Sequence, residues 1–141
     1  MKRRSFLKQC GLSVAYLSCT NSLLSACQTN NIRYSSALHE QADKLTVSMA
    51  EFGTKDFLYV RHPTEPFPIC IVKTDKQQYI ASLMKCTHQH CAVERTPSLF
   101  ICPCHGAKFT HEGVLLKGPA EKNLIRYNVI LEDEMLVISL S

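Results

Sequence analysis

The chain has 141 residues, a length that is enough for one domain with a modest hydrophobic core. Its formal net charge is +4. Four of its 16 basic residues lie in the first eight positions without an acidic neighbour, and the other 12 balance 12 acidic residues. This balance, with no basic stripe carrying interleaved aromatic residues, predicts that the chain has no nucleic-acid partner.

The N-terminal segment resembles an export signal. Residues 2–8 contain the Arg3-Arg4 pair of a twin-arginine signal, and a weakly apolar run follows over residues 10–26. That run is too polar and too short to predict a membrane-spanning helix. It ends in Leu24-Ser25-Ala26-Cys27, which resembles a lipoprotein box, so we expect removal of residues 1–26 and a lipid on Cys27. Cleavage without lipid and retention as an uncleaved anchor are the alternatives.

Residues 27–43 are polar and show no convincing period, which predicts a flexible tether before a domain over residues 44–141. From there the chain consists of short strand-like runs bounded by turn residues, of which residues 45–49 alternate apolar and polar side chains. This pattern predicts an all-β domain. The expected strands cover residues 45–49, 56–62, 67–73, 76–84, 92–95, 99–101, 108–110, 114–116, 124–131 and 135–140.

Two Cys-His units follow the fourth expected strand: Cys86-x-His88 and Cys102-x-x-His105. Each unit offers one thiolate and one imidazole from a short loop. Two such loops brought together suit either zinc or a [2Fe–2S] cluster whose second iron carries histidines. Cys91 and Cys104 are not needed for a four-ligand site.

The motifs Cys86-Thr87-His88-Gln89-His90-Cys91 and Cys102-Pro103-Cys104-His105-Gly106 resemble the Rieske iron–sulfur family. The similar branch is that of quinol–cytochrome reductases and related periplasmic proteins. The resemblance extends through Gly113 to Gly118-Pro119-Ala120, where the family has a loop that covers the cluster. It implies a small antiparallel β architecture in which a cluster subdomain, about residues 83–113, is set on a base domain.

The resemblance also implies the roles of individual residues. It assigns one [2Fe–2S] cluster per chain, with Cys86 and Cys102 on the inner iron and His88 and His105 on the outer iron. It further implies a disulfide between Cys91 and Cys104, which the oxidising periplasm permits. Of the other cysteines, Cys10 and Cys19 leave with the signal and Cys27 takes the lipid. Cys70 lies in an apolar run and is expected to be a buried small hydrophobe.

Several positions differ from high-potential or quinol-oxidising members of the family. Ala107 and Phe109 stand where high-potential members carry Ser and Tyr, whose hydroxyls donate hydrogen bonds to sulfur and stabilise the reduced state. We therefore expect a reduction potential below that of the quinol–cytochrome reductase type. Gln89 and His90 replace a Leu-Gly pair, which weakens the case for an apolar quinol-docking surface. Glu121 replaces a second proline in the cover loop.

These features predict an exported one-electron carrier in the periplasm or at the outer face of the membrane. No nucleophile or paired acid and base is visible, so we expect no substrate turnover of its own. The expected partners are a cytochrome, a quinol-linked complex or a periplasmic oxidoreductase, and Lys85 and Lys108 could guide an acidic one. A zinc-stabilised binding module and the electron-donor ferredoxin of an oxygenase are the alternatives; that ferredoxin branch lacks the cysteine pair. Three other histidines are expected at the surface: His39, His62 and His111.

Overall fold

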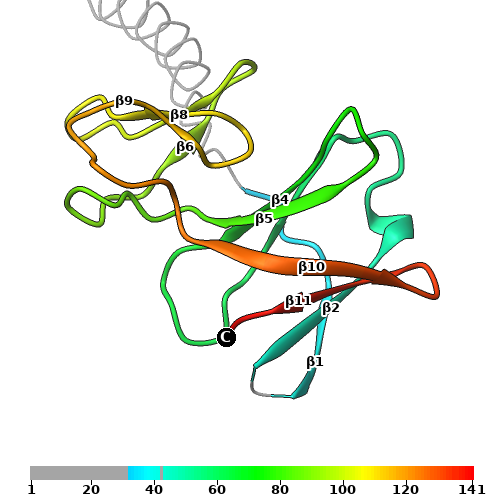
Figure 1. The fold of residues 1–141 in the computed structure, drawn as a ribbon. Coiled ribbons are helices and arrows are strands. Elements are labelled where there is room, and N and C mark those ends of the chain that lie inside the picture. The colour runs from blue at the N-terminus through cyan, green and yellow to red at the C-terminus, as the bar shows by residue number, and fades with distance from the viewer. Residues whose placement is uncertain (1–31, 42) are drawn as a thin grey trace, which may run out of the picture. The chain divides into compact units, whose positions relative to one another are not determined.

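A computed structural model describes residues 32–41 and 43–141, of which Ile32–Ser141 form one compact unit (Figure 1). The expected export signal over residues 1–26 and the expected lipid site at Cys27 lie outside the described residues. Within the described ranges, no helix is long and apolar enough to cross a membrane.

The described residues form antiparallel β-strands and one short 3-10 helix, which confirms the all-β prediction. The strands are β1 (Ala37–Gln41), β2 (Lys44–Ser48), β3 (Phe57–Val60), β4 (Ile69–Lys73), β5 (Tyr79–Leu83), β6 (Glu94–Arg95), β7 (Phe100–Ile101), β8 (Lys108–Phe109), β9 (Leu115–Lys117), β10 (Arg126–Glu132) and β11 (Met135–Ser139). The 3-10 helix η2 (Met49–Glu51) begins where the Ser48 hydroxyl accepts a hydrogen bond from the backbone N–H of Ala50.

The larger sheet has seven strands in the order β1-β2-β11-β10-β5-β4-β3 (Figure 1). β10 joins its two halves, because it pairs with β11 over residues 128–132 but with β5 only at Arg126 and Tyr127. The inward-facing side chains form the first of two hydrophobic cores. Its fully buried members include Leu45, Val47, Val60, Ile69, Ile71, Ala81, Leu136 and Ile138.

The smaller sheet has the strand order β6-β7-β8-β9. Phe100 on β7 and Phe109 on β8 are cross-strand partners and both are fully buried, so they form the centre of the second core. This sheet continues to Lys117, four residues beyond the end expected for the cluster subdomain.

β4 separates the two cores. Ile69 and Ile71 belong to the first core, whereas the alternating Cys70 and Val72 belong to the second. A strand that is buried on both faces has a continuous apolar sequence, as Ile69-Cys70-Ile71-Val72 does. The base sheet therefore supplies one wall of the core that contains the candidate ligand cysteines.

Part of the segment expected to be a flexible tether, residues 27–43, is paired with the base sheet in the structure. β1 pairs with β2 from Ala37↔Val47 onward, and Tyr34 forms a parallel bridge with Tyr59. The backbone N–H of Ser35 donates to the carbonyl of Tyr59 at 2.8 Å. The expectation of a free tether is therefore not met for residues 34–41, because a polar strand can pair through its backbone without any apolar period.

Candidate metal centre

The two Cys-His motifs form loops with equivalent backbone hydrogen bonds. In the first loop the N–H of Cys86 donates to the carbonyl of Cys91 (2.8 Å) and the N–H of His90 donates to that of Cys86 (2.9 Å). In the second, Cys102 donates to Ala107 (2.8 Å) and Gly106 to Cys102 (2.9 Å). Each loop thus spans six residues and is closed at its base.

The strand pairs that flank the loops are equivalent as well. Lys85 and Ala92 are bridged beside the first loop, as Ile101 and Lys108 are beside the second. The sheet framework therefore holds both ligand-bearing loops in one common conformation, although their motifs differ in sequence.

The fifth residue of each loop has a positive φ angle. The angle is +75° at Gly106 and +57° at His90. Glycine adopts this left-handed conformation without a steric penalty, which gives Gly106 a clear role, whereas His90 is an uncommon occupant. No atom of residues 32–41 or 43–141 lies within 4 Å of a Cβ built on Gly106, so its backbone conformation explains this glycine better than close approach of those residues.

The first residues of the two loops, Cys86 and Cys102, are each only 1% exposed. Burial raises the pKa of the Cys86 thiol, while the backbone N–H groups of His88 and Gln89 act in the opposite direction, and the nearby Cys102 thiol raises it further. Two buried thiols side by side, with backbone N–H groups directed at one of them, suit thiolates that bind a metal cation.

His88 and His105 lie near the middle of their loops, and their rings are in contact. Their ring centroids are 5.0 Å apart and the rings are nearly perpendicular, at 87°. The Nδ1 atom of His88 is buried and has no hydrogen-bond partner in the described part of the chain, whereas His105 is exposed. A buried imidazole nitrogen without a partner costs free energy unless something binds it, so this atom is fitted to a metal ligand role.

Cys91 and Cys104 form a disulfide with a Cα–Cα distance of 6.5 Å. The bond ties the two ligand-bearing loops to each other. The Sγ atom of Cys102 lies within 4.8 Å of both disulfide sulfurs. This group of three sulfurs is not itself a metal site, because two of them are bonded to each other; it places the disulfide directly beside a candidate ligand.

A third segment covers the loops. The Thr87 hydroxyl donates to the carbonyl of Lys122 at 2.7 Å, and the N–H of Leu115 donates to Asn123 Oδ1 at 2.8 Å. A cavity of about 410 Å³ lies beside His88, lined by Thr87, His88, Pro119, Glu121 and Lys122. The segment over residues 118–123 thus occupies the place expected for the cover loop.

The structure gives other roles to several residues that the sequence singled out. Lys85 forms an ion pair with Glu65 at 3.1 Å, so it is not a free cation beside the motifs. Cys70 is fully buried, and burial raises the pKa of its thiol to about 12 while Arg95 opposes the rise, which makes it unreactive.

Two of the histidines expected at the surface are instead held by contacts. His111 packs on Phe100, and its Nε2 lies 2.9 Å from the carbonyl oxygen of Thr96. The Nδ1 atom of His62 accepts the backbone N–H groups of Thr64 (3.2 Å) and Glu65 (3.0 Å). The side chain of His39 is not among those described.

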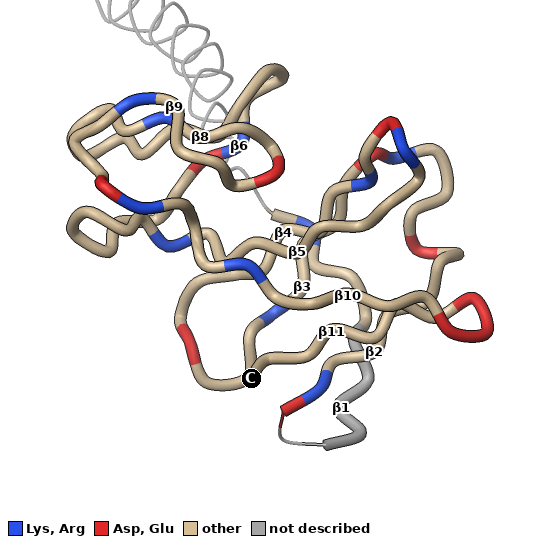
Figure 2. The backbone as a smooth tube through the Cα atoms, viewed as in Figure 1, with Lys and Arg blue, Asp and Glu red and all other residues tan. Residues whose placement is uncertain are grey.

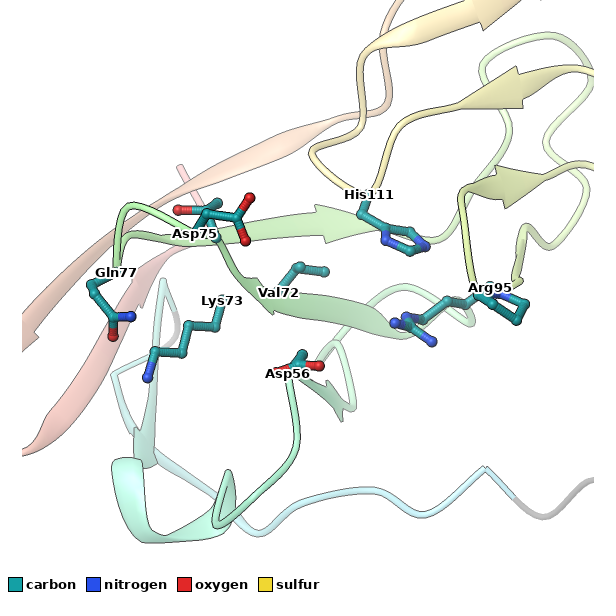
Figure 3. A pocket seen from close by; sticks show the side chains of 9 residues that line it. Asp56, Val72, Lys73, Asp75, Gln77, Arg95 and His111 are labelled. Atoms are coloured by element: carbon teal, nitrogen blue, oxygen red, sulfur yellow. The ribbon is translucent and has the colours of Figure 1, made fainter.

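Arg95 joins the smaller sheet to the base sheet, a contact that the sequence did not reveal. Its guanidinium lies 3.9 Å from the ring centroid of Phe57. It also lines a cavity of about 400 Å³ together with Asp56, Asp75 and His111 (Figure 3). None of the candidate ligands lines this cavity, so it is separate from the metal centre.

Comparison with known proteins identifies the cofactor of the domain that contains these candidate ligands. The protein-family model of the Rieske [2Fe-2S] domain matches residues 34–128 of this chain. The chain belongs to the Rieske family. Because a Rieske domain carries a [2Fe–2S] cluster, this cofactor replaces the zinc alternative, and the chain is an iron–sulfur electron-transfer protein.

Curated relatives of this Rieske protein include iron–sulfur subunits of the cytochrome b6-f complex. The subunit from Chlorobaculum tepidum is 40% identical over 58 residues, which cover 40% of this chain and 32% of the relative. Subunit 2 from Synechocystis is 37% identical over 57 residues, 38% of this chain and 32% of the relative. The matched part therefore spans about a third of these relatives.

Solved structures support the same fold. The plasma membrane Rieske protein PetC3 from Synechocystis superposes with a TM-score of 0.56 at 32% identity, covering 65% of this chain and 94% of that one. A chain from the complex of oxygenase and ferredoxin in carbazole 1,9a-dioxygenase has a TM-score of 0.56 at 17% identity, covering 72% and 96%. The second likeness shows the fold alone.

Proposed function

We propose that this Rieske protein is a one-electron carrier that works in the periplasm, or at the outer face of the membrane, with a lipid on Cys27. The observation that carries the proposal is the disulfide between Cys91 and Cys104, which joins the two ligand-bearing loops. Such bonds persist in oxidising compartments and are rare in the cytosol. The twin-arginine pair Arg3-Arg4 fits export of a domain that already holds its cofactor.

In this proposal Cys86 and Cys102 hold the inner iron, and His88 and His105 hold the outer iron. When bound, the cluster accepts one electron and returns it. The buried Nδ1 of His88 is the nitrogen that would face the iron, which leaves Nε2 to face solvent or a partner. Phe100 and Phe109 exclude water behind the cysteines.

The redox partner is proposed to be a cytochrome, a quinol-linked complex or another periplasmic oxidoreductase. The curated relatives are subunits of the cytochrome b6-f complex, which supports a place in a membrane complex. Ala107 and Phe109, which lack hydroxyl donors, and the polar Gln89 favour a low-potential carrier instead of a quinol oxidant. The disulfide argues against an oxygenase ferredoxin, because that branch lacks the cysteine pair.

Electrochemical titration of the holoprotein tests the electron-carrier function. We expect a single one-electron wave from the bound cluster. A chain that shows no one-electron wave would contradict the function.

Cell fractionation tests the proposed location. The full chain is expected in the membrane fraction, accessible from the periplasmic side, and Cys27→Ala should release it from the membrane. Replacement of Arg3 and Arg4 by Lys should retain it in the cytoplasm. Membrane association that survives Cys27→Ala would favour an uncleaved anchor, and unchanged export of the Lys variant would refute the twin-arginine route.

A further inference from the structure

The outward face of the smaller sheet carries two lysines directly opposite each other. The register pairs Glu94 with Ile101, Ile101 with Lys108, and Lys108 with Lys117, so these four residues form one row across the strands. The alternate residues Phe100 and Phe109 are fully buried, which places the row on the solvent side.

This lysine pair is not neutralised within the domain. Among the described side chains, no carboxylate lies within 4.0 Å of Lys108, Lys117 or Lys122, whereas Lys85 is paired with Glu65. Like charges directly opposite on neighbouring strands destabilise a sheet. The two opposed lysines therefore repel each other, and no ion pair with a described carboxylate offsets this repulsion.

The three unpaired lysines lie on the segments that form the metal centre. Lys108 follows Ala107, whose carbonyl closes the second ligand loop, and it pairs with the residue before Cys102. Lys117 directly precedes the cover loop. Lys122 lines the cavity beside His88.

Basic residues outnumber acidic ones in the part of the domain that holds the candidate ligands, and the reverse holds for the rest of the domain. Residues 83–125 hold five basic and three acidic side chains, whereas residues 32–82 and 126–141 hold seven basic and nine acidic ones. Three of those acids, Glu132 at the end of β10 and Asp133 and Glu134 in the turn to β11, lie at the opposite end of the domain from the lysines of β8 and β9 (Figure 2). The field of the domain is thus positive at the end that holds the ligands.

We propose that Lys108, Lys117 and Lys122 form a docking surface for the acidic face of a redox protein, which rests on the electron-carrier function proposed above. Leu116, which precedes Lys117 on β9, is 58% exposed, so an apolar side chain is also accessible on that strand. A partner steered to this surface exchanges one electron with the cluster near His88, and no covalent bond forms or breaks. Complementary charge raises the association rate, and salt screens it.

The test uses small oxidants of opposite charge as probes of the local field. The reduced holoprotein is mixed in a stopped-flow instrument with ferricyanide, a trianion, or with tris(phenanthroline)cobalt(III), a trication, over a range of ionic strength. The triple variant Lys108→Gln/Lys117→Gln/Lys122→Gln should slow ferricyanide about tenfold at low salt, accelerate the cobalt complex, and match the wild type at high salt. A shift in reduction potential would move both rates in the same direction, so the ratio of the two rates isolates charge.

The matched control is Lys44→Gln/Lys55→Gln/Lys76→Gln, which removes the same charge from exposed positions on the base domain. The proposal holds if this control changes the rate ratio much less than the first variant does. Equal effects of the two variants, or no effect of the first, overturn the docking surface while leaving the carrier function intact. A wild-type chain that exchanges no electron with either reagent overturns the carrier function and the docking surface together.

Discussion

At the scale of single residues, the second core surrounds the proposed ligand cysteines, Cys86 and Cys102, with side chains that cannot donate hydrogen bonds. Ala107 and Phe109 are both fully buried in the core that contains Cys86 and Cys102. A hydroxyl at either position would therefore be desolvated, and the sulfur atoms of the site would be its natural acceptors. We therefore expect that one added hydroxyl oxygen, at position 107 or at position 109, changes the reduction potential.

Ala107→Ser and Phe109→Tyr should each raise the midpoint potential of the holoprotein. A hydrogen bond to sulfur stabilises the more negative, reduced state, and an effect on the order of 50–100 mV per hydroxyl corresponds to an ordinary charge-assisted hydrogen bond. Protein-film voltammetry measures the shift. Phe109→Leu, which alters packing without adding a donor, is the control and should leave the potential near the wild-type value. Unchanged potentials in the Ser and Tyr variants would refute this account of tuning.

His62 should make the stability of the domain depend on pH. Burial lowers the pKa of His62, and Glu65 opposes this, while Nδ1 accepts two backbone N–H groups that only the neutral ring can accept. The unfolded chain takes up the proton first, so this contribution is present above the ordinary value of about 6.5 and is lost as pH falls below it.

Denaturation of the holoprotein between pH 7.5 and 5 measures this effect. His62→Asn keeps an acceptor but does not titrate, so its stability should decrease less than that of the wild type over this range. The two proteins would have parallel profiles if His62 were an ordinary surface histidine.

At the scale of elements, Gly113 holds the turn after β8 against β5. Its φ angle is +79°, and an added Cβ would lie 2.8 Å from the hydroxyl of Ser82, which is itself buried without a hydrogen-bond partner among the residues that the structure describes. Gly113→Ala should destabilise the domain by about 1–3 kcal/mol, because it adds both strain and a clash.

A double-mutant cycle separates these two costs. Ser82→Ala alone should be nearly neutral, because it removes an unsatisfied hydroxyl, and it should recover about 0.5–1 kcal/mol of the loss in the Gly113→Ala background. Urea denaturation of the four proteins gives the coupling free energy. Strict additivity would mean that backbone strain accounts for the whole effect.

The disulfide between the ligand loops should contribute strongly to their order. The two cysteines are separated by 13 residues, and closure of a loop of this size in the unfolded chain is worth about 3 kcal/mol in the chain-entropy account. The double variant Cys91→Ser/Cys104→Ser should lower the free energy of unfolding by about 3 kcal/mol. It should also lose the visible absorption of the cluster faster on warming. A mild reductant should weaken the wild type in the same way and leave the double variant unaffected. A wild type indifferent to the reductant would show that the bond does not stabilise the loops.

Local pattern predicted most of the strands but not their partners. The alternation of apolar and polar residues places β2, and short apolar runs place β3, β4 and β11. The four apolar residues of β4 reflect a strand that lies between two cores. The pattern of β1 gave no signal, because its pairing is a property of the backbone. The short contact between β10 and β5 joins residues more than 40 positions apart, which no local period encodes.

The two Cys-His motifs could be recognised from spacing because each lies within one short loop, and the structure brings these loops together. The ion pair of Lys85 with Glu65 and the stacking of Arg95 on Phe57 could not, since each joins residues at least 20 positions apart. The equivalence of the two loops was hidden for a different reason. Their shared backbone hydrogen bonds do not depend on which position carries the second cysteine or the histidine.

At the scale of the whole molecule, a sheet base holds two loops and a cover segment at one end. β4 provides a common wall for both cores, and Arg95 joins the smaller sheet to the base. The ion pair of Lys85 with Glu65 ties the start of the first loop to the connection between β3 and β4. Positive charge gathers at the ligand end and acidic residues at the far turn (Figure 2). This arrangement suits a carrier that presents one face to a partner and keeps its ligands fixed while doing so.

Pulsed EPR of the reduced holoprotein tests the ligand set most directly. Two histidine nitrogens coupled to the electron spin are expected, and the variants His88→Cys and His105→Cys should each remove one of them. A spectrum without nitrogen coupling, or with coupling that neither variant alters, would contradict ligation by Cys86, His88, Cys102 and His105.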